Sequence, residues 1–390
     1  MSKRIGIEVS LAVSEAVKMA DTDVISAYPI TPQTHIVEHL SELVADGELD
    51  AEFIPVESEH TAMSCAIGSS ASGARTFTAT SSQGLALMHE LLYIASSLRL
   101  PIVMAVVNRA LSGPINIWND HSDVMGERDT GWIQLFADNG QEAFDLTLQA
   151  FRVAEHPEVL FPVMVNIDGF SLSHVIEPVI MPEEELVRKF LPPFQPVFKL
   201  DPAKPISLGI FGIPEIYYET KKAGDEALVA AKKTIYQVWD EFDGLFGRRY
   251  QALETYKVEG ADTLLVTMGS IGETAMTAVD ELRAEGKKIG LVRLRLWRPF
   301  PDDEFKAIAG RARQIAVVDR CVTMGSHGNP VFQEIRSLLY PQADRPHVFN
   351  FTLGIGGRDV TRDSFKYIYD QCQVLPDKGQ DRFEMVGVME

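Results

Sequence analysis

The stretch Ala27-Tyr28-Pro29-Ile30-Thr31-Pro32-Gln33-Thr34 joins a strand-like run at residues 23–27 to a helical pattern that starts without a linker. Threonine is a frequent helix N-cap, and proline fits the first helical position because the N–H it lacks has no intrahelical partner there. The sequence therefore predicts Thr31 as the N-cap and Pro32 as the first helical residue. A helix that begins at the carboxyl end of a parallel strand is a favourable site for a small anion. A well-capped helix without a ligand is the alternative for this segment alone.

The same strand-then-helix pattern recurs through the first 170 residues. The run at 101–107 is continuously apolar, which is typical of a strand buried on both faces. A helix of small residues, 62–71, follows Glu57-Ser58-Glu59-His60. Further strands are predicted at 53–56, 76–80 and 159–167, and further helices at 85–98 and 141–155. This alternation predicts an α/β fold with a doubly wound parallel sheet.

Four polar side chains fall just beyond the carboxyl ends of predicted strands: Thr31, Glu59, Ser82 and Arg109. Each has a simple structural explanation, since Glu59 could complement a helix dipole, Ser82 could cap a helix and Arg109 could be a surface cation. Because parallel strands bring their carboxyl ends to one edge of the sheet, the four together predict a site there.

Composition and charge limit the possible partners and location of the protein. The 390 residues, 46% of them hydrophobic, are enough for two or three globular domains. The net charge of −19 argues against nucleic acid or an anionic membrane surface as a partner. No apolar run approaches a membrane span, and the N-terminus reads as the start of a domain rather than a signal peptide, so we expect a cytoplasmic protein.

Cysteine and histidine spacing gives no metal-binding motif. The three cysteines, Cys65, Cys321 and Cys372, are too scattered for a disulfide framework, a zinc site or an iron–sulfur site. Any redox metal centre is therefore expected on another chain. His121 lies in a polar cluster at 118–123, which we interpret as a loop network because no second ligand stands at metal-binding spacing.

Three regions follow from the changes in pattern. Residues 1–170 form the first α/β domain, 171–260 a proline-rich segment attached to it that embraces a partner or bridges domains, and 261–390 a second, smaller α/β domain. The second domain has glycine-rich turns at 324–328 and 353–358. Neither has the spacing of a dinucleotide-binding fingerprint, so tight turns are predicted.

Six segments together carry a family resemblance. They are Tyr-Pro-Ile-Thr-Pro (28–32), Glu-Ser-Glu-His (57–60), Ser-Ser-Gln-Gly (81–84), Asn-Arg-Ala (108–110), Asn-Asp-His-Ser-Asp-Val-Met (119–125) and Leu-Arg-Leu-Trp-Arg-Pro-Phe-Pro (294–301). In this combination the chain resembles, over nearly its whole length, the α subunit of multi-subunit 2-oxoacid:ferredoxin oxidoreductases, most closely the pyruvate enzyme.

The resemblance implies a thiamine diphosphate enzyme assembled from several chains. This chain would supply the pyrimidine-binding domain and a domain like the C-terminal domain of transketolase, and would be inactive alone. The diphosphate and Mg²⁺ would be held by a partner chain, since no Gly-Asp-Gly followed by Asn at the family's spacing occurs here. The resemblance also implies [4Fe-4S] clusters on β-, γ- and δ-type subunits, ferredoxin or a similar electron acceptor, and coenzyme A as co-substrate.

Site roles follow by matching positions to the family. Glu59, with Glu57 as the alternative, matches the carboxyl group beside the pyrimidine ring, which must exchange a proton near neutral pH. Thr31 and Arg109 match the positions that hold the 2-oxoacid, and an arginine suits a carboxylate because it can bind both oxygens. Tyr28, Pro29 and Ser82 are expected to contact the cofactor with Glu59.

The substrate is less closely defined. One arginine favours a monocarboxylate, with pyruvate first, whereas oxalate and 2-oxoglutarate fit less well because a dicarboxylate calls for more positive charge. Phenylglyoxylate or a branched-chain 2-oxoacid needs only a larger pocket, which Gly113, in place of the Ala expected in the pyruvate enzyme, would help to provide. A non-catalytic assembly subunit and a dinucleotide-binding enzyme remain the alternatives of other classes.

Overall fold

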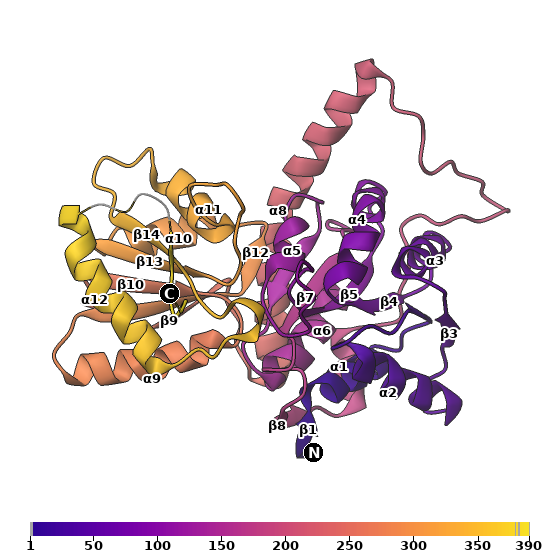
Figure 1. Cartoon of the computed structure of the whole chain (residues 1–390). Helices are drawn as coiled ribbons and strands as arrows, with labels where there is room; N and C mark the ends of the chain where they lie inside the picture. The colour runs from indigo at the N-terminus through magenta and orange to yellow at the C-terminus, as the bar shows by residue number, and fades with distance from the viewer. Residues whose placement is uncertain (1–2, 379, 381–382, 390) are drawn as a thin grey trace.

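Two largely parallel β-sheets, placed side by side, organise the chain in the computed structural model (Figure 1), which describes residues 3–378, 380 and 383–389. The few remaining positions of the predicted first and last regions, 1–2, 379, 381–382 and 390, lie outside the described residues. Helices cover both faces of each sheet, which confirms the predicted doubly wound α/β fold.

The first sheet holds the strands expected from the first 170 residues. Its order is β12 (Leu296–Arg298), β6 (Ile133–Phe136), β7 (Val163–Asp168), β5 (Ile102–Asn108), β4 (Thr76–Thr80), β2 (Val24–Ala27) and β3 (Glu52–Pro55). All neighbouring pairs are parallel except β12 with β6. Every residue of β5 is buried, because helices pack on both of its faces.

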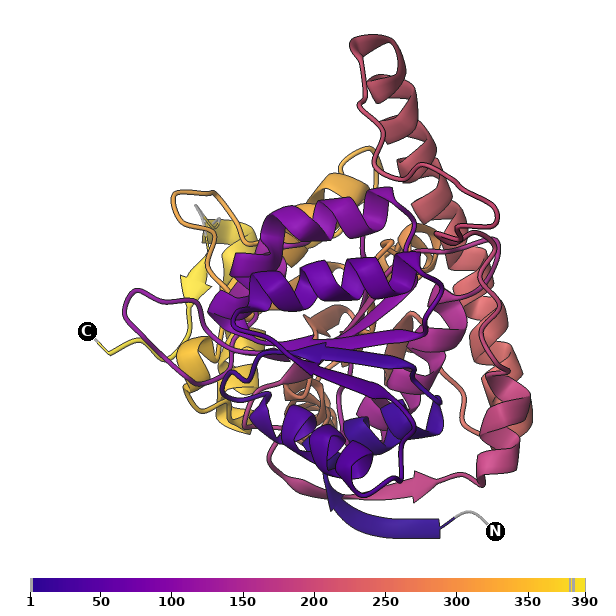
Figure 2. The ribbon, with the colours of Figure 1, turned by 90° about the vertical axis from the view of Figure 1, so that its right-hand side faces the viewer.

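Two layers of helices enclose this sheet (Figure 2). On one face pack α1 (Val9–Met19), α2 (Thr34–Ala45) and α6 (Gly140–Ala154), together with part of α8. On the other pack α3 (Glu59–Ala71) and α4 (Ser82–Ser97), which share one core with the second sheet. Ala62 and Ala66 of α3 are fully buried, and their small side chains allow close packing. The short helix α5 (Ser122–Gly126) lies against α4 and β5.

The second sheet is built from the C-terminal part of the chain. Its order is β15 (Glu384–Met385), β14 (His347–Thr352), β13 (Gln314–Asp319), β10 (Thr263–Thr267), β11 (Ile289–Leu294) and β9 (Leu253–Tyr256), with only β9 antiparallel. The accompanying helices are α9 (Ile271–Ala284), α10 (Asp302–Ala309), α11 (Pro330–Leu339), α12 (Arg362–Lys378) and the short 3-10 turn η1 (Ile355–Gly357).

The middle segment is partly anchored and partly projecting. Strand β8 (Ile176–Met181) pairs antiparallel with β1 (Lys3–Glu8), and α7 (Glu184–Phe190) follows. The polar, helix-like pattern at residues 217–242 predicts a helix, and the structure extends it to α8 (Pro214–Phe246). The buried residues of α8 begin at Ala231, whereas its first half stands clear of the body (Figure 1). No helix among the residues that the structure describes is long and apolar enough to cross a membrane.

One strand crosses between the two parts of the chain. The sequence pattern predicts a single strand at 289–296 in the second domain, but the structure divides this stretch into β11 and β12. Strand β12 leaves the second sheet and closes the edge of the first by pairing with β6. Trp297 at its centre is fully buried in the core that both sheets share, which supplies the physical reason for the switch.

The carboxylate of Asp168 joins the two sheets. This residue ends β7, and its oxygens accept hydrogen bonds from Arg320 Nη1 at 2.7 Å, the Ser270 N–H at 2.8 Å and the Ser270 hydroxyl at 2.5 Å, with His121 Nε2 2.8 Å away. Burial alone would raise the pKa of Asp168, but Arg320, His121 and Ser270 outweigh burial and hold the pKa below its ordinary value. Asp168 is therefore a buried anion shared by both halves of the molecule.

Replacement of Asp168 by alanine should destabilise the chain strongly. The Arg320 side chain is only 4% exposed, so Asp168→Ala leaves an uncompensated buried cation. Breaking a buried ion pair in this way costs about 3–5 kcal/mol. The measurement is the free energy of unfolding of the purified chain by chemical denaturation.

The matched control is Glu184→Ala, which removes an exposed ion pair with Arg188 on α7. Such pairs contribute about 0–1 kcal/mol, so the control should unfold almost like the unmodified chain. Equal losses in the two variants would show that Asp168 does not carry the interaction between the sheets.

Candidate active site

The turn that connects β2 to α2 differs from its prediction. Helix α2 begins at Thr34, not at Pro32, and Gln33 is the residue that precedes it. The Gln33 N–H instead closes a turn onto the Ile30 carbonyl at 2.8 Å. Thr31 is exposed on this turn and is not a helix cap, so the predicted N-cap role is wrong. The side chain of Gln33 imposes the turn, because its amide group is buried and has partners on both sides.

Tyr28 and Pro29 lie at the start of the same turn. Tyr28 is 37% exposed and Pro29 is also exposed. The Gln33 amide donates to the Tyr28 carbonyl at 2.9 Å and to the Ala79 carbonyl of β4 at 3.2 Å. This clamp fixes the turn against the carboxyl end of β4 and leaves the Tyr28 side chain accessible to a ligand or partner chain.

Arg109 lies where the sequence places it, directly after β5, and is buried rather than on the surface. Its Nη1 donates to the Thr31 carbonyl at 2.8 Å and its Nε to the Asn116 carbonyl at 2.9 Å. Two of the five guanidinium N–H groups are thus used, and the other three have no partner in the described part of the chain. Burial lowers the pKa of Arg109, while the nearby Asp123 opposes that shift. Thr31 and Arg109 therefore come together, and the cation has donors left for an anion.

Glu59 is the first residue of α3 and faces inward. Ser58 caps the helix by accepting the Thr61 N–H at 3.2 Å, and Glu59 is 8% exposed. Among the described residues, its carboxylate has no hydrogen-bond or ion-pair partner. A Cβ on Gly84 would lie 2.7 Å from Glu59 Oε1 and 2.5 Å from Thr80 Oγ1, so only glycine leaves space beside the carboxylate.

Glu57, the alternative for the same role, is in a different setting. It is exposed, and the Thr61 hydroxyl donates to its Oε1 at 2.6 Å. This hydrogen bond lowers the pKa of Glu57. A group that exchanges a proton near neutral pH needs the opposite shift, so the setting of Glu57 does not suit this role.

Ser82 is linked to Arg109 through Asp123. Ser82 begins α4 with φ +47°, and its hydroxyl donates to the Ala110 carbonyl at 2.6 Å. Asp123 Oδ2 accepts the backbone N–H of Ser82 at 3.1 Å and that of Arg109 at 2.9 Å. Asn108 donates to the other oxygen at 3.1 Å. One buried carboxyl group thus sets the spacing of two predicted site residues.

Several buried acceptors at this edge have no partner within the described residues. They include Gln33 Oε1, Thr80 Oγ1 and Asn108 Oδ1, which lie at or beside the carboxyl ends of β2, β4 and β5. Buried polar atoms are normally hydrogen-bonded, and exceptions often mark a place for a ligand. These acceptors and the Glu59 carboxylate can accept hydrogen bonds from a heterocycle that carries N–H donors, such as an aminopyrimidine.

The polar cluster at 118–123 forms the loop network that its sequence predicts. Asp120 accepts from the N–H and hydroxyl of Ser122, and His121 pairs with Asp168. Asp123 is the member with a direct role at the site, which its sequence alone did not reveal. The sequence shows Asp123 only as part of a dense polar run. Its hydrogen bonds to Arg109 and Ser82 join residues that are 14 and 41 positions apart, which the sequence pattern does not reveal.

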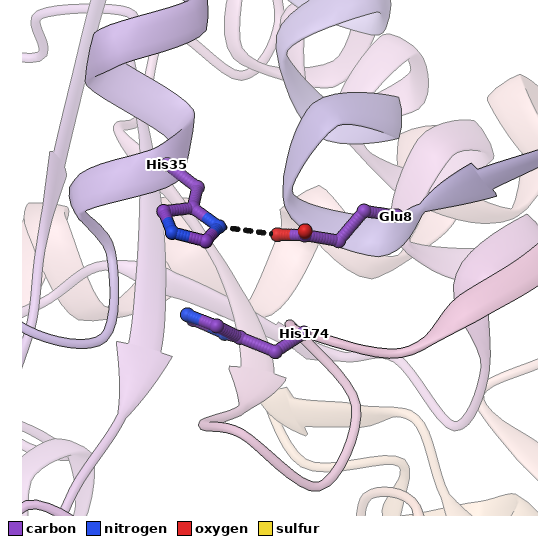
Figure 3. A group of neighbouring side chains, drawn as sticks. All are labelled: Glu8, His35 and His174. Carbon is purple, nitrogen blue, oxygen red and sulfur yellow. Dashed lines mark hydrogen bonds and ion pairs between the residues drawn. The ribbon is translucent and has the colours of Figure 1, made fainter.

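One group of side chains has the composition of a metal site. Ligand atoms of Glu8, His35 and His174 all lie within 4.8 Å of one another. Figure 3 shows His35 directed at the Glu8 carboxylate, 2.6 Å away, with the His174 ring beneath it, tilted by 36° at a centroid distance of 4.4 Å. His174 Nδ1 lies 2.8 Å from the Ser173 hydroxyl, and burial, helped by His35, lowers the pKa of His174. We interpret the group as a hydrogen-bonded cluster with a tilted contact between its two rings, and we assign no ion to it.

Asp123 should make the stability of the chain depend on pH. Burial raises its pKa from 3.8 to about 7, although hydrogen bonds from Arg109, Asn108, Ser82 and Val124 oppose the shift. Between these two values the folded chain holds a proton that the unfolded chain has released, so stability falls as the pH rises toward 7. Asp123→Asn resembles the protonated acid and does not titrate. The free energy of unfolding of the unmodified chain, relative to this variant, should therefore be lower at pH 8 than at pH 5.

Chemical denaturation of both proteins at several pH values provides the measurement. A constant difference between them from pH 5 to pH 8 would show that Asp123 does not change its protonation in this range.

Comparisons with known proteins agree with this geometry. Residues 15–240 match the family model described as pyruvate flavodoxin/ferredoxin oxidoreductase, thiamine diphosphate-binding, and residues 261–365 match pyruvate:ferredoxin oxidoreductase core domain II. The pyruvate synthase subunit PorA of Methanocaldococcus jannaschii is 51% identical over 97% of this chain and 96% of its own. The ketoisovalerate oxidoreductase subunit VorA of Pyrococcus horikoshii is 45% identical over 95% of this chain and 93% of its own.

Solved structures support the same fold. A 2-oxoglutarate:ferredoxin oxidoreductase from Magnetococcus marinus, with 2-oxoglutarate, coenzyme A and succinyl-CoA bound, superposes with TM-score 0.70 at 20% identity over 95% of this chain and 65% of that chain. A split-gene transketolase superposes with TM-score 0.54 at 12% identity over 95% of this chain and 99% of that chain. These likenesses concern the fold, whereas the matched models include a thiamine diphosphate-binding one over residues 15–240, and the chain belongs to the pyruvate:ferredoxin oxidoreductase family.

Proposed function

We propose that this chain is the α subunit of a pyruvate:ferredoxin oxidoreductase, which decarboxylates pyruvate oxidatively to acetyl-CoA and CO₂. It would bind the pyrimidine of thiamine diphosphate and the 2-oxoacid, while partner subunits carry the remaining chemistry. Family membership, the similarity to pyruvate synthase subunits and the geometry of the sheet edge support this assignment.

One observation carries the proposal: two buried ionisable side chains at the same sheet edge lack an ion-pair partner in the described part of the chain. Glu59 is an unpaired carboxylate and Arg109 a cation without a carboxylate partner. Buried charges are costly unless they are paired, so a fold that keeps two of them free is prepared for external ligands. A non-catalytic assembly subunit would have no reason to preserve this cost.

Each residue then has a separate task. Arg109 binds the carboxylate of pyruvate with its free N–H groups, and the turn at Thr31 closes the same side of the pocket. Glu59 would lie against the pyrimidine of bound thiamine diphosphate and would give and take a proton at Oε1 or Oε2. The bound cofactor supplies the nucleophilic carbon that attacks the 2-oxo group. Ser82 and the clamp at Tyr28 shape the pocket around these groups, and Pro29 borders it.

The partners follow from what this chain lacks. We place the diphosphate and Mg²⁺ site and the [4Fe-4S] clusters on β-, γ- and δ-type subunits, with ferredoxin accepting electrons one at a time, coenzyme A accepting the acetyl group, and the complex in the cytoplasm. The first half of α8 and the loop that precedes it offer a contact surface for a partner. In this region Ile210, Phe211 and Tyr218 are 70%, 87% and 78% exposed. Exposed apolar groups of this size are typical of protein interfaces.

Ketoisovalerate is the second candidate substrate, because the VorA relative is nearly as similar as the PorA relative. Both acids are monocarboxylates that Arg109 suits equally, and they differ in the apolar part of the pocket. The deciding experiment uses the intact complex, purified without oxygen, and follows viologen reduction with pyruvate, ketoisovalerate, phenylglyoxylate and 2-oxoglutarate, each with and without coenzyme A.

Pyruvate should give the highest kcat/KM, and the reaction should require coenzyme A. A higher value for ketoisovalerate would move the substrate assignment and keep the chemistry. No reduction with any 2-oxoacid, from a complex shown to contain thiamine and iron, would overturn the proposed function.

Replacement of Glu59 by glutamine should remove the proton-transfer step. Loss of a general acid–base group lowers kcat by about 10²–10⁴-fold. The melting temperature should stay the same or rise, since the substitution removes an unpaired buried charge. The measurements are steady-state kinetics and thermal unfolding of the complex.

Glu57→Gln is the matched control, two residues away and exposed. It should retain activity within about twofold, because surface substitutions rarely disturb a site. A large loss in Glu57→Gln with full activity in Glu59→Gln would transfer the role to the alternative residue.

A further inference from the structure

The turn after β14 has a geometry that only glycine adopts easily. Gly354, Gly356 and Gly357 have φ values of +73°, +58° and +79°, in the left-handed region. The segment is thus a tight turn, as the sequence predicts, and it includes η1. Its glycines also allow the turn to approach closely the loop that follows β5 in the other half of the molecule.

Three hydrogen bonds join this turn to that loop. Asn116 Nδ2 donates to the Gly356 carbonyl at 3.1 Å, and the Gly356 N–H donates to Asp120 Oδ2 at 3.2 Å. The Gly357 N–H donates to the Asn119 carbonyl at 2.7 Å. The loop donates one of these hydrogen bonds and the turn donates the other two. Together they fix the orientation of the loop as well as its distance from the turn.

The contact leaves no space for side chains on the turn. A Cβ on Gly356 would lie 2.6 Å from Asn116 Nδ2, and a Cβ on Gly357 would lie 2.3 Å from Trp118 Cβ. These separations are shorter than ordinary van der Waals contact. A methyl group at Gly357 must displace Trp118 at its Cβ, and a methyl group at Gly356 must displace the Asn116 side-chain amide from the Gly356 carbonyl.

The displaced residue would be the one that holds Arg109. The Asn116 carbonyl accepts Arg109 Nε at 2.9 Å, while the Asn116 side chain binds both Gly356 and the Trp118 N–H, the latter at 2.6 Å. The Ala110 N–H donates to the Trp118 carbonyl at 3.0 Å and closes the loop beside Arg109. A continuous path of hydrogen bonds therefore runs from the second sheet to the guanidinium group.

We propose that the glycine turn at residues 354–357 positions Arg109 for the 2-oxoacid, with Asn116 as the connecting residue. The inference rests on the proposed role of Arg109 and extends it, because it gives the second, transketolase-like half of the chain a part in substrate binding. Asn116 and Gly356 are positioning residues: they act through Arg109 and have no direct contact with the reacting atoms.

The test is Gly356→Ala in the intact complex. The methyl group breaks the hydrogen bond from the Asn116 amide to the Gly356 carbonyl, so the Asn116 carbonyl no longer holds the guanidinium group in place for the carboxylate of pyruvate. Arg109 binds this carboxylate in the ground state and in the transition state alike, so its misplacement weakens binding rather than the chemical step. We expect KM for pyruvate to rise about tenfold, with kcat at saturation and KM for coenzyme A changed by less than about twofold. A purely structural defect would lower kcat and affect both substrates alike.

Gly325→Ala is the control for backbone strain. Gly325 lies in the other glycine-rich turn with φ +74°, and nothing lies within 4 Å of its Cβ position. It should reproduce the stability change of Gly356→Ala, measured by thermal unfolding, and leave both KM values unchanged. A rise in KM for pyruvate in this control as large as in Gly356→Ala would overturn the proposal.

A double-variant cycle separates this inference from the function on which it rests. Asn116→Ala, which deletes the connecting side chain without crowding, should raise KM for pyruvate in the Arg109 background and have little effect when combined with Arg109→Lys. Additive effects of the two substitutions would overturn the positioning role. An unchanged KM in Arg109→Lys alone would instead overturn the role of Arg109 in the proposed function.

Discussion

The carboxylate of Asp168 is the interaction on which the arrangement of the molecule depends. It ends a central strand of the first sheet and binds the start of α9 and Arg320 from the second. Arg320 also lies 3.5 Å from the Gly354 carbonyl through Nη2, and its own carbonyl accepts the His121 N–H. The next residue, Gly169, packs against the Asn108 carbonyl and Pro32. The same ionic centre therefore fixes the turn at 354–357, the loop at 116–121 and the edge where the ligands are expected.

Charges elsewhere in the core make the free charges of the site more informative. Arg75 pairs with Glu155 and Arg295 with Glu142, in each case with both side chains less than a tenth exposed. Where the fold needs a buried charge for its own stability, it provides the partner. Glu59 and Arg109 lack such partners in the described part of the chain, so the energetic cost of the free charges is concentrated at the sheet edge where the ligands are expected.

The sequence predicted what depends on local pattern. Alternating apolar runs and helical periods gave the α/β class, and the topology of parallel strands then brought Thr31 and Arg109 together and linked Ser82 to Arg109. The prediction failed where a distant group decided the outcome. Thr31 does not cap α2 because the amide of Gln33 binds β4, 46 residues away. The sequence places Asp123 in a polar loop. Its hydrogen bonds to residues that follow two strands could not be predicted, because the periodicity of a sequence does not encode contacts between loops.

Strand β12 has a further consequence for how the protein can be handled. The sequence suggests a cut near residue 260 to obtain the two halves separately, yet the strand that closes the first sheet lies at residues 296–298. An N-terminal fragment would expose the hydrogen-bonding edge of β6 and the apolar surface that Trp297 covers, and unpaired edges of this kind promote aggregation. The C-terminal fragment would carry a tryptophan-bearing strand with no sheet to join. Although its halves are separate in sequence, the chain folds as one piece, and recombinant expression has to respect that.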